Sequence, residues 1–183
     1  MKVSSAVLVL FFAVTGITVS AAADWPPPVA PMIPRALGFV PIPGAAVAPD
    51  PSHVYKVIFD TTRAAAKPEL PADGILFAAT DLSALRGQGV APLNTRFALI
   101  FHGRAIDAIL DNAHYRAKFG IDNPNLPLLS GLKKAGAEIL VCGQSLAATR
   151  IDPASLSPDV TVASEAFIVL ITYQNDGYAV LQF

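Results

Sequence analysis

Residues 138–149 read EILVCGQSLAAT, a short apolar run that leads directly into small residues typical of a helix. This pattern predicts a buried strand that ends at Cys142, followed by a short helix over about 144–149. Two other apolar runs, HVYKVIFD at 53–60 and RFALIFH at 96–102, predict strands of the same buried kind. The sequence therefore places three buried strands in the core of the fold.

The segments between these runs predict helices. In residues 73–88 apolar side chains recur at helical spacing, and Gly87 and Gly89 end the pattern. The other predicted elements are helices over 105–110, 112–119, 126–135 and 164–176, and short strands over 160–162 and 178–182. Apolar strands that alternate with helices indicate a parallel sheet covered on both faces. The predicted fold of residues 53–183 is a three-layer α/β/α sandwich with a mainly parallel five-stranded sheet.

Residues 1–23 have the features of a cleavable signal peptide. Lys2 precedes an almost unbroken apolar run over 7–19, and the small residues 21–23 are typical of a cleavage site near Ala23. The apolar run is shorter than the roughly 20 residues of a membrane span. We expect a periplasmic or secreted protein with no membrane span after cleavage. An uncleaved anchor is the alternative.

Residues 24–52 form a proline-rich N-terminal arm that contains nine of the 16 prolines. Proline fixes φ and removes an amide donor, so the arm is expected to be extended or irregular. It also carries large apolar side chains such as Trp25 and Ile33, unlike a solvated linker. These features favour an arm that lies against its own domain or a neighbouring subunit. A disordered tether is the alternative.

Composition excludes several classes of function. The formal net charge is −1, and no run of basic residues is present, so nucleic acid is not an expected partner. No spacing of His, Cys and carboxylate residues suggests a metal site, and no GxGxxG, P-loop, GxSxG or CxxC motif suggests a cofactor, a hydrolase or a thioredoxin. The chain has one cysteine, so it cannot form an internal disulfide.

Three chemically capable residues stand where buried strands end. They are Asp60, His102 and Cys142. Ligands gather beyond the carboxyl ends of the strands in an open parallel sheet, so these side chains could share one edge. A helix after Cys142, with Gly143 at the turn, would favour the nucleophilic thiolate. A buried and inert core cysteine is the alternative.

The other candidates have competing interpretations. His102 could act as a base or as a charge partner of the thiolate, or its imidazole could bond to backbone in a turn. Asp60 could bind a ligand or belong to a turn. The polar loop over 120–126 could contact a ligand through Asn123, although Asn125 could cap the helix that follows. Ser164 is a candidate cap for the last predicted helix.

The strings YKVIFD, ALIFHG and YRAKFGIDNPNLPLLSGLKKAGAEILVCGQSLA resemble the DsrE/DsrF-like proteins over about residues 54–183. The resemblance implies a three-layer α/β fold that assembles into trimers or hexamers. It also implies that Cys142 carries a persulfide, taken from and passed to a protein or a small sulfur compound. Relay members of this family work in the cytoplasm, and their cysteine precedes an arginine-bearing helix. Here an export signal is present and Cys142 enters a Cys-Gly-Gln-Ser context.

Two functions are therefore expected from the sequence. The first is an exported, homo-oligomeric DsrE-like protein in which Cys142 handles sulfur as nucleophile and carrier, with His102 as an auxiliary. The second is a non-catalytic module for small-ligand binding or assembly, in which Cys142 is structural.

Overall fold

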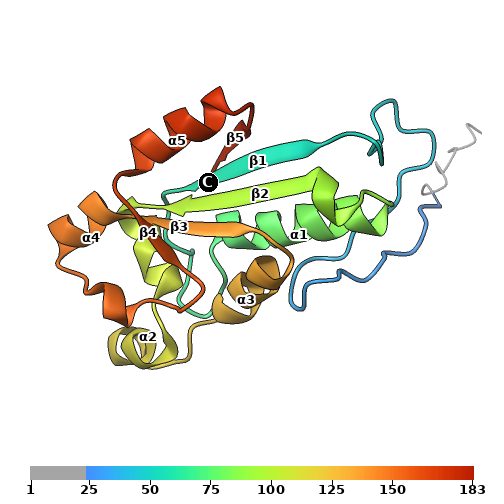
Figure 1. Cartoon of the computed structure of the whole chain (residues 1–183). Helices are drawn as coiled ribbons and strands as arrows, with labels where there is room; N and C mark the ends of the chain where they lie inside the picture. The colour runs from blue at the N-terminus through green and yellow to red at the C-terminus, as the bar shows by residue number, and fades with distance from the viewer. Residues whose placement is uncertain (1–23) are drawn as a thin grey trace, which may run out of the picture.

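The computed structural model describes residues 24–183, so the predicted signal peptide lies outside the described residues. A single sheet has the strand order β4-β3-β2-β1-β5 (Figure 1). Its strands are β1 (Tyr55–Thr61), β2 (Thr95–Phe101), β3 (Glu138–Cys142), β4 (Thr161–Ala163) and β5 (Ala179–Gln182). All four strand pairings are parallel, so the predicted five-stranded α/β fold is confirmed and its sheet is wholly parallel.

The helices follow the predicted order. They are α1 (Asp73–Gly87), α2 (Asn112–Phe119), α3 (Leu126–Lys134), α4 (Gly143–Thr149) and α5 (Ala166–Asn175). The helix predicted over 105–110 is instead a 3₁₀ segment, Gly103–Ile109. Its chain becomes extended at Leu110 to form an antiparallel bridge with Leu156, which leaves no room for further α-helical turns. None of the helices within residues 24–183 is long and apolar enough to cross a membrane.

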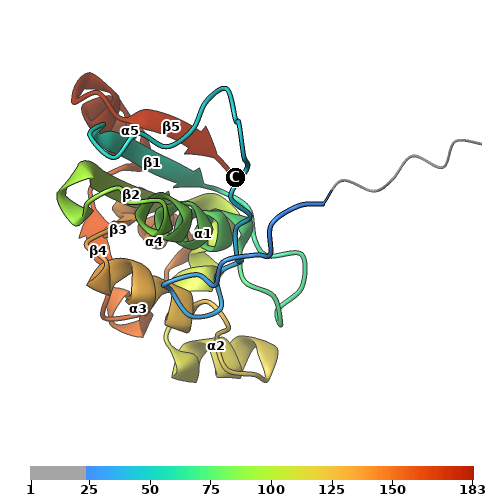
Figure 2. The same ribbon diagram turned by 90° about the vertical axis from the view of Figure 1, so that its right-hand side faces the viewer.

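The strands alternate their side chains between two apolar layers. Odd-numbered residues such as Phe59, Leu99 and Val141 pack with α1 and α3 in the larger layer. Even-numbered residues such as Ile58 and Ile100 pack with α5 in the smaller layer, on the opposite face. Figure 2 shows α5 and the pair α1 and α3 on different sides of the sheet. The three predicted layers are therefore present, and within residues 24–183 α5 is the helix that covers the second face of the central strands.

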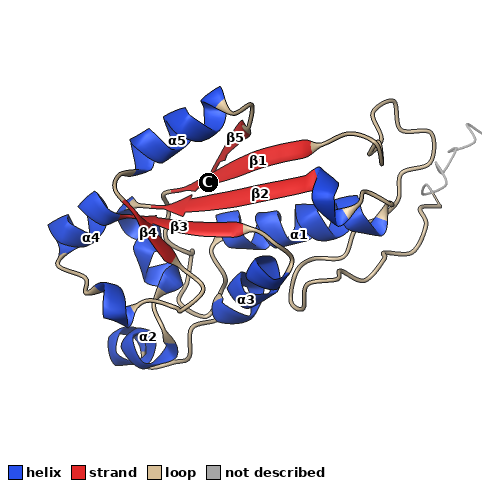
Figure 3. Ribbon diagram, in the orientation of Figure 1, coloured by secondary structure: helices blue, strands red, loops and turns tan. Residues whose placement is uncertain are grey.

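The proline-rich arm lies on its own domain. It contains no helix and no named strand (Figure 3). An antiparallel bridge joins Val29 to Phe39. Ile33 is only 1% exposed, and its backbone amide donates to Ser83 Oγ of α1 at 3.3 Å. Its side chain fits against Gly131 of α3, where an added Cβ would come within 2.4 Å of Ile33 Cγ2. The arm thus covers part of the α1 and α3 layer.

Two predicted helix caps differ in the structure. The cap at Ser164 is wrong, because α5 begins at Ala166 after Glu165 and has no side-chain cap. Asn125 precedes α3 but does not cap it with its side chain. Its Oδ1 accepts from the Ala72 amide at 2.8 Å, which ties the start of α3 to the start of α1. Asn125 is 1% exposed, and this tertiary hydrogen bond satisfies its buried Oδ1, while its Nδ2 donates to Asn123 Oδ1 at 2.9 Å.

Candidate functional site

The structure brings Asp60, His102 and Cys142 to the carboxyl edge of three adjacent strands. Cys142 packs with Ile58 and Ile100 on the α5 face of the sheet. Asp60 and His102 each lie two residues beyond one of these isoleucines, so the strand period places them on the same face. In the register of β2 and β3, Ile100 pairs with Leu140 and Phe101 pairs with Val141. Continued by one residue, this register sets His102 opposite Cys142, across strands spaced about 4.8 Å apart.

Asp60 and His102 form a close side-chain pair. His102 Nε2 lies 2.7 Å from Asp60 Oδ1, and the two side chains are 17% and 8% exposed. The second carboxylate oxygen, Oδ2, accepts from Gln182 Nε2 of β5 at 3.3 Å. The alternative in which the His102 imidazole bonds to backbone in a turn is therefore wrong. Asp60 is not a turn residue either, because it lies within β1 and is buried.

Cys142 ends β3 and is 4% exposed. It lies at a small pocket of about 200 Å³ between the carboxyl edge of the sheet, α4 and the start of α5. The pocket is lined by His102, Cys142, Gln144, Ser145, Ala148, Glu165, Ala166 and Phe167. The Cys142 thiol and the His102 imidazole therefore line one pocket. Asp60, which does not line the pocket, contacts the imidazole through its carboxylate.

The surroundings of Cys142 shift the ionisation of its thiol. Burial alone raises the pKa of the Cys142 thiol, because it disfavours the charged thiolate. Hydrogen bonds from the Ser145 hydroxyl and from the backbone amides of Ser145, Ala166 and Gln144 act in the opposite direction. Together these hydrogen bonds lower the pKa by more than burial raises it, so the pKa of the Cys142 thiol lies below its ordinary value. The sulfur is thus poised toward thiolate, the nucleophilic form.

Gly143 is the first residue of α4, and its position has a packing reason. A Cβ added there would approach the carbonyl oxygen of Ala163 to 2.8 Å and that of Ser164 to 3.3 Å. The missing side chain lets the α4 turn close against the chain that follows β4. Gly143 does not line the Cys142 pocket, although it fixes the turn on which Cys142 stands.

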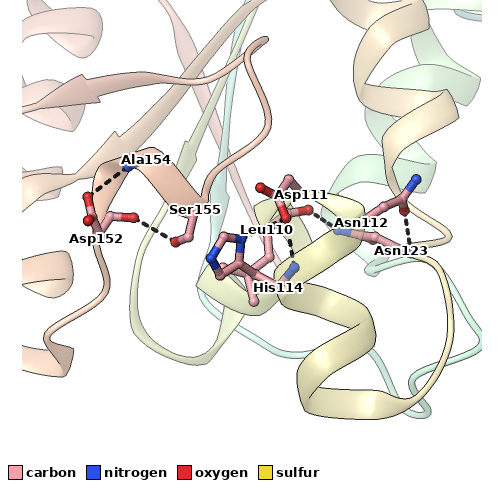
Figure 4. A network of polar contacts seen from close by, with 8 residues as sticks. All are labelled: Leu110, Asp111, Asn112, His114, Asn123, Asp152, Ala154 and Ser155. Carbon is pink, nitrogen blue, oxygen red and sulfur yellow. Dashed lines mark hydrogen bonds and ion pairs between the residues drawn. The ribbon is translucent and has the colours of Figure 1, made fainter.

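Asn123 lies apart from this site. It is 3% exposed, and its Nδ2 donates to the carbonyl oxygens of Leu110 at 2.6 Å and Ala108 at 3.0 Å. Its backbone amide donates to Asn112 Oδ1 at 2.9 Å, in a polar network at the start of α2 (Figure 4). These hydrogen bonds organise the loop before α3. The structure does not bring Asn123 together with Cys142.

Several residues of the pocket were not predicted from the sequence. Ser145, Glu165 and Phe167 come from α4 and from the start of α5. Gln182 reaches Asp60 because β5 lies beside β1, an order that no local pattern encodes. The motif CGQS does contain Ser145 three residues after the cysteine, a spacing that lets a side chain in the first turn of a helix face the residue before it. Within residues 24–183, no group of three or more His, Cys, Asp or Glu side chains could hold a metal ion.

Comparisons with known proteins agree with this architecture. The model of the DsrE/DsrF-like family matches residues 57–183. A protein of unknown function from Methanobacterium thermoautotrophicum has a similar structure, with a TM-score of 0.50 and 17% sequence identity, over 70% of this chain and 99% of that one. No curated protein matches this sequence. Because the family match covers well over half of the chain, the protein belongs to the DsrE/DsrF-like family.

Proposed function

We propose that this protein handles sulfur through Cys142, which alternates between a thiolate and a persulfide. The observation that carries the proposal is that Cys142 lines a pocket at the carboxyl edge of the sheet together with His102. The lowered pKa of the Cys142 thiol agrees with it. Membership of the DsrE/DsrF-like family supports the same chemistry, because sulfur relay is associated with this family. Cys142 is the nucleophile and the carrier, and His102 is the auxiliary.

The proposed reaction needs no external oxidant. The Cys142 thiolate attacks the outer sulfur of a donor of the form R–S–SH. A new S–S bond forms on Cys142, the S–S bond of the donor breaks, and its electron pair leaves with R–S⁻. An acceptor thiolate then takes the outer sulfur in the same way and restores the Cys142 thiolate. The amides of Ser145 and Ala166 hydrogen-bond the sulfur, so they favour its anionic form before and after transfer.

A second function is favoured by a specific observation. Cys142 is 4% exposed and packs in the smaller apolar layer with Ile58 and Ile100. In a module for ligand binding or assembly, the same burial would make Cys142 a packing residue only. The two functions differ in the accessibility of the thiol in the folded protein.

Alkylation of the native protein across pH separates these functions. The sulfur-handling function predicts modification of Cys142 below the pH at which an ordinary thiol reacts. It also predicts a mass increase of one sulfur atom after exposure to inorganic polysulfide, lost on reduction. Cys142→Ser is the control for adducts elsewhere. A thiol that reacts only after denaturation contradicts sulfur handling and supports the packing function.

Export is a separate part of the proposal. The features of residues 1–23 support cleavage near Ala23 and a periplasmic or secreted location. N-terminal sequencing of the protein recovered from the periplasm of an expressing bacterium tests it. Asp24 is the expected first residue, and retention of Met1 on membrane-associated protein would show an uncleaved anchor instead.

We further propose that the protein is a homo-oligomer, a trimer or hexamer. The outer face of α5 supports this, because Phe167, Ile168 and Ile171 are 62%, 51% and 54% exposed and the helix carries no charged residue. Native mass spectrometry of the protein and of Ile168→Lys tests it. The variant should shift toward monomer, while Leu93→Lys, at an apolar residue that is 85% exposed elsewhere, should not. A wild-type monomer contradicts this part of the proposal.

A further inference from the structure

Asp60 and Gln182 fix the orientation of His102. The Asp60 carboxylate receives His102 Nε2 on one oxygen at 2.7 Å and Gln182 Nε2 on the other at 3.3 Å. An ionised carboxylate can only accept, so the pair places the ring proton of the neutral imidazole on Nε2. Nδ1 is then the nitrogen that is free to gain or lose a proton. Within residues 24–183, no side chain or backbone group is hydrogen-bonded to His102 Nδ1.

The free side of the imidazole belongs to the Cys142 pocket. His102 and Cys142 both line the cavity, and the strand register sets them opposite each other on one face of the sheet. Phe167 stands edge-on to the imidazole, with ring centroids 5.9 Å apart, and shields it on the α5 side. No hydrogen bond joins the two residues across the described part of the molecule, so any coupling between them acts through the space of the pocket that they share.

We propose that Asp60 and Gln182 are positioning residues that hold His102 as the counter-ion and proton store of Cys142. The inference rests on the proposed function, since it assigns roles within the same site. When the Cys142 S–H bond breaks, its electron pair stays on sulfur and the proton passes to His102 Nδ1 through solvent in the pocket that both residues line. The imidazolium is then held between the Asp60 carboxylate and the thiolate. When Cys142 is protonated again, the same proton returns.

Few charged groups surround His102 and Cys142. Glu165 is the only carboxylate among the residues that line the pocket, and its negative charge opposes the thiolate. Neither α4 nor α5 carries an acidic or basic residue, and the only titratable side chain on α5 is Tyr173. Tyr173 does not line the pocket, and it interacts with Glu138 at the other end of β3. The imidazolium is therefore the one positive charge that the pocket lining can offer to the Cys142 thiolate.

The test measures ionisation directly, by the ultraviolet absorbance of the thiolate across pH, with Cys142→Ser subtracted to remove the tyrosine signal. His102→Gln keeps a side chain that can bond Asp60 but cannot store a proton. At a pH below the wild-type midpoint, we expect its thiolate fraction to fall about tenfold. Asp60→Asn should cause a smaller fall in the same direction. In the His102→Gln background, Asp60→Asn should cause no further change, because Asp60 acts through the imidazole.

The chain contains a matched control pair. His114 Nδ1 lies 2.8 Å from Asp111 Oδ1 at the start of α2, remote from the pocket (Figure 4). His114→Gln and Asp111→Asn should leave the thiolate titration of Cys142 unchanged. A fall of the thiolate signal in these variants would show a general effect of charge or folding and would overturn the proposal.

A second measurement tests the proposal if the His102 and Asp60 variants fail to fold. Coupling between two sites is reciprocal, so Cys142→Ser should shift the nuclear magnetic resonance titration of the His102 ring protons to lower pH. An unmoved His102 titration, or an unchanged thiolate titration in folded His102→Gln, overturns the proposal. A coupled titration without persulfide on Cys142 would leave the coupling intact and contradict the proposed sulfur handling alone.

Discussion

The ring of Phe167 stands edge-on to the imidazole of His102, with ring planes at 71° and centroids 5.9 Å apart. Phe167 is 62% exposed, yet it lines the pocket that contains Cys142. One side chain therefore forms the rim of the site and also part of the apolar outer face of α5. Access to the Cys142 thiol therefore depends on Phe167, which also belongs to the face of α5 proposed to contact another subunit.

Phe167→Ala should open the pocket. Removal of the phenyl ring widens the approach to Cys142, so alkylation by a bulky maleimide should accelerate more than alkylation by iodoacetamide. The ratio of the two rates is the measurement. Ile168→Ala is the control, because Ile168 is 51% exposed on the same helix but does not line the pocket. Equal acceleration with both reagents would indicate that α5 has loosened and would contradict a rim role.

Ser145→Ala should make Cys142 harder to ionise. The Ser145 hydroxyl hydrogen-bonds the sulfur and lowers the pKa of the Cys142 thiol, so its loss should raise that pKa. Because alkylation follows the thiolate fraction, the rate should fall at low pH and approach that of the wild type at high pH. The measurement is the pH profile of iodoacetamide modification. Thr149→Ala changes the far end of α4, where its hydroxyl bonds the Ser145 carbonyl, and should leave the profile in place.

Glu165→Gln should change which reagents enter the pocket. The Glu165 carboxylate is the one acidic side chain in the pocket lining, so it repels anionic reagents. We expect the rate with iodoacetate, relative to that with neutral iodoacetamide, to rise by about twofold or more in the variant. Glu138→Gln is the control, because Glu138 begins β3 at the opposite end from Cys142. An unchanged ratio would show that Glu165 does not face the approaching reagent.

Ile33→Ala should destabilise the domain although the residue lies in the proline-rich arm. Ile33 is 1% exposed against α1 and α3, and its truncation should cost about 2 kcal/mol of the free energy of unfolding. Ile42→Ala, in the same arm but 52% exposed, should change it by less than about 0.5 kcal/mol. Urea unfolding measures both. Equal stability of the two variants would contradict a docked arm.

Much of the fold follows from local sequence patterns. The stretch EILVC forms β3 with the predicted bounds, because a run of apolar and β-branched residues has to be buried and extended. The helical spacing over 73–88 forms α1 for the same kind of reason. The cap at Ser164 failed because capping depends on how the chain enters α5 from β4, which is a tertiary matter.

The candidate site, like the fold, follows partly from local sequence and partly from tertiary packing. By itself, the sequence determined that Asp60, His102 and Cys142 stand at or next to strand ends. Only the tertiary structure decided the strand order β4-β3-β2-β1-β5, which makes the three strands neighbours and adds Gln182 from β5. It also decided that Glu165 and Phe167 border the thiol. The physical reason is that periodicity records which face a side chain takes, whereas its partners across the sheet depend on how distant segments pack.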